Sequence, residues 1–210
     1  RERAGKEKPV TVWLTLPVTP KGLTPDATAA VATMLAAGVD LAGVNIMTMD
    51  YGESKTPNQS MGQAALSALD ATHRQLGVLF RQAGIELGES ALWDKLGATP
   101  MIGQNDVTPE VFTLADAHVV NEYAHERGIG RLSMWSLNRD TTCGPNYDDL
   151  SRVSDSCSGI DQKDSTFAKT LGADFTGSPG QELGTVTTAE PQPDNPSDDP
   201  ATSPYRIWDE

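Results

Sequence analysis

Polar side chains follow three predicted strands of this chain, each at the point where the strand ends. They are an acid with a phenol, two amides with an acid, and an indole with an amide and a guanidinium: Asp50 and Tyr51; Gln104, Asn105 and Asp106; Trp135 with Asn138 and Arg139. Functional groups collect at the carboxyl ends of parallel strands. Amides and acids bind sugar hydroxyls, and an indole packs on the apolar face of a sugar ring. The set therefore favours a carbohydrate site.

A structural role for the same residues is the alternative. Asp106 and Asp140 are residue types that cap loops, and Trp135 is of a type that fills cores. Residue type alone does not separate these readings.

The strands that precede these groups are short, apolar and β-branched. We expect them at Val10 to Val18, Leu41 to Met49, Thr99 to Ile102 and Gly130 to Trp135. The predicted helices begin with N-cap signatures or apolar periodicity and span residues 24–38, 60–83, 108–127 and 165–171.

Strands and helices alternate along the chain, which predicts an α/β fold with parallel strands and right-handed crossovers. Four such units fit either an open doubly wound sheet or half of a closed barrel. The chain has 210 residues, whereas a complete (β/α)8 barrel typically needs about 250.

Cys143 and Cys157 stand in a polar segment with residues 144–156 between them. If the protein is secreted, the pair predicts one local disulfide, which stabilises by about 3 kcal/mol in the chain-entropy model. The alternative is two unpaired cytosolic thiols. No paired His or Cys at ligand spacing supports a zinc site, and we expect no metal.

The charge balance excludes some partners. The chain has 16 basic and 29 acidic residues, for a net charge of −13, which disfavours nucleic acids and anionic membrane surfaces. No apolar run approaches the roughly 20 residues of a membrane helix. Nucleotide-binding glycine motifs and a serine-hydrolase elbow are absent, so no cofactor is expected. An uncharged polysaccharide is compatible with this charge.

The composition changes near the carboxyl end. Residues 177–203 are rich in Pro, Ser, Thr, Gly and acids, which predicts an extended linker after a folded part at 1–176. Residues 204–210 then include Tyr205 and Trp208, which suggests the start of a second domain. The chain begins at Arg1 rather than Met, so we expect a processed product or a piece of a longer protein.

Three strand-end segments resemble glycoside hydrolase family 18, the chitinases. VNIMTMDYG (44–52), TPMIGQND (99–106) and LSMWSLNRD (132–140) are similar to the family's sixth, seventh and eighth strands, and VWLTLPV (12–18) fits the fifth. Residues 205–208 also resemble the opening of a small chitin-binding module of the family 5/12 type.

This resemblance implies a (β/α)8 TIM barrel of which the chain supplies about units five to eight, with the amino-terminal half missing. It also implies substrate-assisted retaining hydrolysis of β-1,4-linked N-acetylglucosamine in chitin or chito-oligosaccharides, by a secreted enzyme. Asp50 then orients the substrate acetamide, and Tyr51, one place later than the family's tyrosine, takes the phenol role. The implied substrate-binding residues are Met49, Gln104, Asn105, Asp106 and Trp135.

One departure from the family bears on catalysis. The Asp-x-x-Asp-x-Asp-x-Glu motif, whose glutamate is the general acid, occurs nowhere in the 210 residues. We therefore expect the chain alone to be inactive, with the acid supplied by preceding barrel units. A chitin-binding lectin of the same fold is the alternative, and an endoglycosidase acting on glycoprotein glycans is a third.

Overall fold

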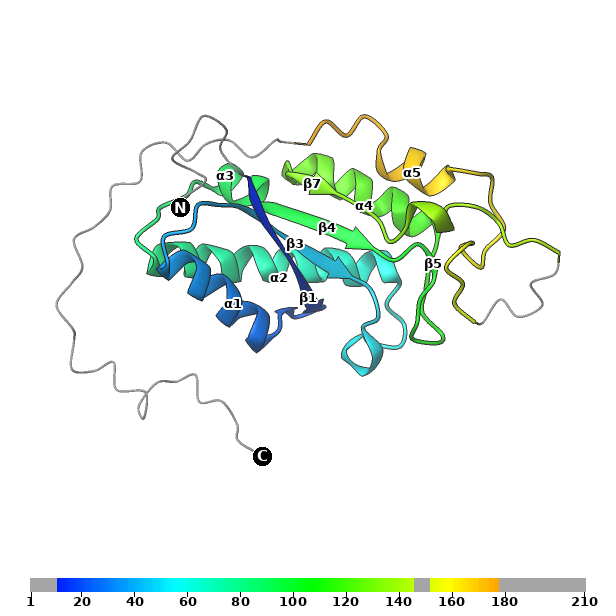
Figure 1. Cartoon of the computed structure of the whole chain (residues 1–210), viewed down its shortest axis with the longest axis horizontal. Helices are drawn as coiled ribbons and strands as arrows, with labels where there is room; N and C mark the ends of the chain where they lie inside the picture. Colours follow the sequence, from blue (N-terminus) through cyan, green and yellow to red (C-terminus); the bar gives the residue numbers. More distant parts are fainter. Residues whose placement is uncertain (1–10, 146–151, 178–210) are drawn as a thin grey trace.

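The computed structural model describes residues 11–145 and 152–177. Strands in the order β2-β1-β3-β4-β7 form one open sheet, and β5 and β6 form a separate hairpin-like pair (Figure 1). The strand bounds are β1 Val12–Thr19, β2 Gly22–Leu23, β3 Leu41–Thr48, β4 Leu96–Pro100, β5 Gly103–Gln104, β6 Val111–Phe112 and β7 Arg131–Leu132. The predicted α/β class and the four principal strands are confirmed, but the third strand begins and ends earlier than predicted and the fourth is shorter.

The strands β1, β3, β4 and β7 are parallel and lie in sequence order. Right-handed crossovers between strands in that order place every connecting helix on the same face. The helix bounds are α1 Pro25–Ala36, α2 Met61–Gln82, α3 Glu89–Asp94, α4 Leu114–Arg127 and α5 Thr166–Leu171, with 3-10 turns η1 Gly52–Ser54 and η2 Leu137–Arg139.

Helix starts agree with the capping signals where those signals are complete. The Thr24 side chain accepts the Ala27 N–H at the start of α1. Ser60 and Gln63 form a capping box at the start of α2. Local hydrogen bonding explains both boundaries.

The helix predicted from residue 108 was wrong at its start. The Thr108–Pro109 peptide is cis, β6 follows, and α4 begins only at Leu114. The true N-cap is Thr113, which forms a capping box with Asp116. Thr113 forms this reciprocal pair of bonds, which the earlier Thr-Pro pattern does not, so the helix starts there.

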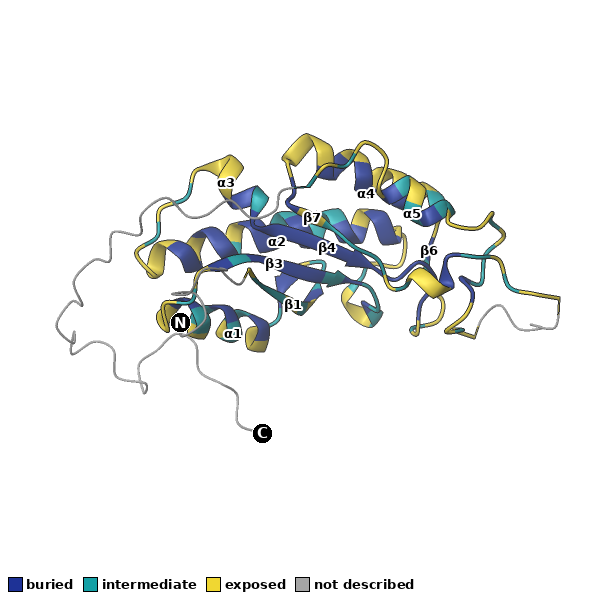
Figure 2. Ribbon diagram, turned by 45° about the horizontal axis from the view of Figure 1, so that its top comes forward, coloured by how far each residue is buried: buried dark blue, intermediate teal, exposed yellow. Residues whose placement is uncertain are grey.

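One face of the sheet packs against helices in a dry core. Val44, Ile46 and Leu96 are fully buried in the same apolar cluster as Leu69 and Leu76 of α2. Figure 2 shows β3 and β4 as almost continuously buried ribbons, with exposed residues on the outer sides of the helices. Near-continuous apolar strands of this kind are expected in a parallel sheet.

The opposite face carries polar and aromatic side chains. The Trp13 ring extends over Gly43, where an added Cβ would lie 2.3 Å from it, and the Arg131 guanidinium lies 4.4 Å from its centroid. The Asn45 amide donates to Thr15 Oγ1 at 3.3 Å and to Thr99 Oγ1 at 2.7 Å. Asn45 Oδ1 is buried without a hydrogen-bond partner among the described residues.

The strands within residues 11–145 and 152–177 form an open sheet, and no closed barrel is present there. None of the helices in this part of the chain has the length and apolarity to cross a membrane. Apart from Gly177, the predicted linker at 177–203 and the segment 204–210 lie outside the described residues.

Candidate active site

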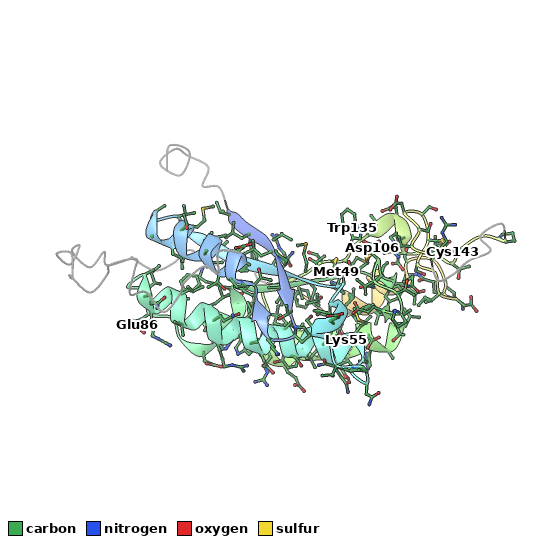
Figure 3. All side chains as sticks on the ribbon, turned by 90° about the horizontal axis from the view of Figure 1, so that it is seen from below. Met49, Lys55, Glu86, Asp106, Trp135 and Cys143 are labelled. Atoms are coloured by element: carbon green, nitrogen blue, oxygen red, sulfur yellow. A yellow bond between two sulfur atoms is a disulfide. The ribbon has the colours of Figure 1, made fainter. Side chains whose placement is uncertain are left out.

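The predicted site residues gather at the carboxyl end of the parallel strands. Figure 3 shows the labels of Met49, Asp106 and Trp135 close together, between Cys143 and the distant Glu86. The first belongs to the loop after β3, the second to the loop after β5, and the third follows β7. The parallel topology therefore brings these groups to the carboxyl ends of the strands, as the sequence predicted.

Asp50 occupies an unusual backbone conformation at this edge. Its φ is 49°, in the left-handed region, which an aspartate tolerates better than most residues. Its carboxylate Oδ1 accepts the Val107 N–H at 3.1 Å, and its own N–H donates to Asn105 Oδ1 at 3.3 Å. The side chain is half-buried. Asp50 is thus a half-buried residue whose carboxylate is held by a backbone N–H.

Tyr51 lies in a different environment. Its side chain is 5% exposed and belongs to the apolar core, and its hydroxyl has no hydrogen-bond partner among the described residues. Burial, and secondarily the charge of Glu110, raise the pKa of the phenol well above its usual value. The hydroxyl is therefore a neutral group without solvent contact here, and its predicted role at the substrate stays a prediction.

Gln104 and Asn105 use their side chains within the protein. The Gln104 amide donates to the carbonyls of Asn105 and Glu110 at 3.0 and 3.2 Å. The Asn105 amide donates to the carbonyls of Met101 and Gly103 at 2.9 and 3.1 Å. Both residues are buried. This arrangement shows them shaping the loop after β4, while their substrate-binding role stays a prediction.

Three other predicted residues reach solvent. Trp135 is 56% exposed, so it does not fill the core. Its backbone is held at the edge of β4, where its N–H donates to the Pro100 carbonyl at 2.8 Å. Asp106 is exposed and Met49 is half-buried. The exposed indole of Trp135 offers an apolar surface for a sugar ring, and the exposed carboxylate of Asp106 at the same edge offers an acceptor for sugar hydroxyls.

Glu110 is a buried acid at this edge that sequence reasoning did not single out. It is 5% exposed, yet its two carboxylate oxygens accept the N–H groups of Tyr51 and Gly52, each at 2.9 Å. The available signal was the acid itself, but the pattern Thr108-Pro109-Glu110 favoured a helix start. Glu110 instead connects the loop between β5 and β6 with the loop after β3.

A disulfide fastens the segment that follows Trp135. Cys143 and Cys157 are joined with a Cα–Cα distance of 5.0 Å. The next residue, Ser158, accepts the Gln104 N–H at 2.7 Å through its carbonyl. Buried Arg139 donates to the carbonyls of Gln104 and Cys157 at 2.6 and 3.4 Å. The cysteine loop therefore supports the loop after β4 from outside.

Asp140 has a structural capping role, the alternative that the sequence analysis gave for this residue. Its carboxylate accepts the N–H groups of Phe167 and Ala168 at 3.0 and 2.8 Å. It thus satisfies the start of α5. Within the described residues no group of three or more His, Cys, Asp or Glu side chains is placed to hold a metal.

Solved structures similar to this chain are chitinases. Active domain 2 of the thermostable chitinase from Pyrococcus furiosus, described in complex with chito-oligosaccharides as catalytic-site mutants, is 32% identical with a TM-score of 0.68. The match covers 80% of this chain and 51% of that domain. The catalytic domain of the hyperthermophilic chitinase of that organism is 34% identical with a TM-score of 0.67, covering 77% and 49%.

Curated relatives have similar names. A probable bifunctional chitinase/lysozyme of Escherichia coli is 40% identical over 145 residues, which are 66% of this chain and 16% of the relative. Endochitinase 11 of Metarhizium anisopliae is 40% identical over 139 residues, or 63% and 26%. The chain thus spans about a quarter or less of these relatives. No protein-family model matches the chain.

Proposed function

We propose that the chain is the carboxyl-terminal half of a glycoside hydrolase family 18 chitinase that cleaves β-1,4 linkages between N-acetylglucosamine units of chitin. The observation that carries the proposal is half-buried Asp50, held by the Val107 N–H, at the same sheet edge as exposed Trp135, in a fold similar to chitinase catalytic domains. The similarity supports the activity and the family, and the residue roles are those that the resemblance implies.

The proposed chemistry uses the substrate's own acetamide. Its carbonyl oxygen attacks the anomeric carbon as the glycosidic bond breaks, and a cyclic oxazolinium ion forms with a positive charge. Water then opens this ring with retention of configuration. A fixed carboxylate beside the acetamide stabilises that charge without having to reorganise. Asp50 has this property because the Val107 N–H holds one of its oxygens.

Trp135 would form the floor of the subsite that holds the reacting sugar. The residue is exposed, and an indole face packs well on the axial C–H groups of a pyranose ring. Asp106 is exposed at the same edge and is available for sugar hydroxyls. Met49 would contribute apolar contact beside Asp50.

The general acid is proposed to come from the other barrel half. The Asp-x-x-Asp-x-Asp-x-Glu motif is absent from this sequence, and the chain matches about half of the chitinase domains it resembles. The open polar face, with Asn45 Oδ1 buried and unpartnered among the described residues, is what a barrel interior would complete. The chain alone should therefore be inactive.

The missing motif also favours a second candidate, a lectin-like chitin-binding protein of the same fold. A carboxylate and an indole suffice for binding but not for leaving-group protonation. An endoglycosidase would need the same acid, so the lectin is the alternative that this observation supports.

The deciding experiment is hydrolysis of chitotetraose by the complete gene product and by the 210-residue chain. Hydrolysis by the complete product, with an initial β-anomer and no activity of the chain, is the expected result. Binding without hydrolysis by the complete product would replace the chitinase with the lectin. Hydrolysis by the chain alone would refute the division of the site between two halves.

The disulfide and the composition of the carboxyl-terminal segment support a secreted enzyme. The Cys143–Cys157 disulfide is of the kind that persists in oxidising compartments. We propose an extracellular location, with the linker at 177–203 leading to a chitin-binding module that begins at 204–210.

A further inference from the structure

We propose that Glu110 is a positioning residue: its carboxylate fills the backbone concavity formed by residues 50–52 and so fixes the Asp50 carboxylate for the substrate. The catalytic part of this inference rests on the proposed chitinase function. The part that concerns the loop stands on the structure alone.

The loop after β3 has the backbone of an anion-binding concavity. Tyr51 is right-handed helical, with φ −71° and ψ −26°, and Gly52 follows with a φ of 54°. Alternation of this kind turns successive N–H groups toward one point. Such concavities often receive a phosphate or another anion. Here the anion is a side chain of the protein.

The three consecutive N–H groups of this loop all donate to side chains of one neighbouring segment. Asp50 N–H donates to Asn105 Oδ1, Tyr51 N–H to Glu110 Oε2, and Gly52 N–H to Glu110 Oε1. In return, Asp50 Oδ1 accepts the Val107 N–H. The two loops therefore hold each other through side-chain acceptors, without a strand ladder between them.

Glu110 is itself held before it acts on the loop. Its N–H donates to the Val107 carbonyl at 2.8 Å, and its own carbonyl accepts the Asn105 N–H at 3.0 Å and the Gln104 amide at 3.2 Å. The side chain is buried, and no cation pairs with it among the described residues. Its charge is therefore matched by the two loop N–H groups.

Asp50 depends on this arrangement because its left-handed φ of 49°, although aspartate tolerates it better than most residues, needs local hydrogen bonds to persist. Without the Glu110 carboxylate, the Tyr51 and Gly52 N–H groups lose their acceptors, and the turn has less reason to persist. The Asp50 carboxylate would then leave its bond to Val107. A misplacement of about 1 Å at a reacting centre costs up to about 100-fold in rate.

Asp116 provides a matched control. It is also buried, at 6% exposure, and also accepts a backbone N–H on each oxygen, from Gly62 and Thr113, both at 2.8 Å. These bonds fasten the starts of α2 and α4, and neither donor belongs to the residue 50–52 loop. Asp116→Asn therefore makes the same chemical change at a buried carboxylate without touching this loop.

The first test is amide hydrogen exchange in the 210-residue chain. Glu110→Gln keeps one acceptor and presents an NH2 group to the other N–H, so exchange at Tyr51 or Gly52 should rise about tenfold. Glu110→Ala should raise exchange at both, and added formate should restore protection by occupying the vacated concavity. Asp116→Asn should leave both amides unchanged. Unchanged exchange in Glu110→Gln would overturn the proposal.

The second test is turnover of chitotetraose by the complete gene product. Glu110→Gln should lower kcat by about 100-fold with KM changed by less than about threefold, and formate should raise the kcat of Glu110→Ala. A kcat no lower than that of Asp116→Asn would overturn the positioning role. Inactivity of the wild-type protein would instead remove the chitinase function, and the exchange and formate results would still decide whether Glu110 holds the loop.

Discussion

The carboxyl edge of the sheet and the helical layer on its covered face both use acidic side chains as hydrogen-bond acceptors, but for different ends. At the edge, Glu110 and Asp50 accept backbone N–H groups of loops that present side chains to solvent. In the layer, we define the aromatic cluster as His73 of α2, Trp93 of α3 and Tyr123 of α4. The His73 and Trp93 rings stack with centroids 3.9 Å apart, and Trp93 meets Tyr123 edge-on at 6.1 Å.

Charged groups surround the aromatic cluster without reaching the sheet edge. Tyr123 donates to Asp70, the Trp93 N–H donates to Glu89 at 3.1 Å, and the Arg127 guanidinium lies 5.4 and 5.1 Å from the Trp93 and Tyr123 ring centroids. These contacts join three helices to one another. Acidic side chains thus hold two loops together at the edge, whereas in the layer they fasten helices to one another.

The largest expected effect is at the edge. Asp50→Asn keeps an oxygen for the Val107 N–H but loses the negative charge, so kcat of the complete gene product should fall by about 100- to 1,000-fold. Its melting temperature should stay close to that of the wild type. Steady-state kinetics on chitotetraose and thermal melts measure the two. A kcat of Asp50→Asn equal to that of the wild type would contradict the role proposed for Asp50 in a chitinase site.

Tyr51→Phe is the companion substitution, because it removes only the buried hydroxyl. If the phenol acts on the acetamide as the resemblance implies, kcat should fall at least about tenfold. If burial keeps the hydroxyl from the substrate, kcat stays within about threefold. Since the ring is 5% exposed, we expect the second result.

A smaller effect is expected at Trp135. The exposed indole contributes little to folding, so Trp135→Ala should leave stability unchanged while weakening chitotetraose binding by about tenfold, or about 1.4 kcal/mol. Calorimetric titration of a general-acid-deficient complete product measures this affinity. Trp135→Phe should retain part of it. An unchanged dissociation constant would show that the exposed ring faces away from the ligand.

In the helical layer, Tyr123→Phe should change stability and not activity. The Tyr123 hydroxyl donates to Asp70, while burial, and secondarily that hydrogen bond, raises its pKa to about 12. Losing a hydrogen bond to a charged group should cost about 1.5–3 kcal/mol in the free energy of unfolding, measured by urea denaturation. A loss of turnover beyond the unfolded fraction would contradict the separation of the two regions.

The smallest effect is a pH dependence that originates at His73. Desolvation lowers its pKa below the ordinary 6.5, against Glu89 and Asp70, which raise it, while Arg127 also lowers it. The unfolded chain therefore binds more protons just below pH 6.5, and stability is lost as pH falls from there through the folded-state pKa. His73→Gln should flatten the melting temperature between pH 7 and 5.5. A steeper fall of melting temperature with decreasing pH in His73→Gln than in the wild type would show that the His73 pKa is raised on folding and not lowered.

Much of the fold follows from short-range signals in the sequence. The order of strands and helices, the caps at Thr24 and Ser60, and the acid at the end of the second parallel strand were all predicted from local patterns. Hydrophobic periodicity and N-capping involve residues within a few positions of each other. A short stretch of sequence is therefore enough to predict these features.

Tertiary structure decided which of the strand-end residues face solvent and which hold the loops. Tyr51 and Asn105 are buried whereas Trp135 is exposed, although all three stand at equivalent strand ends. Glu110 bonds the N–H of a residue 59 positions earlier, and no local pattern marks that pairing. A backbone donor needs only an acceptor at the right place in space, so its partner is chosen by how the strands assemble and not by the neighbouring sequence.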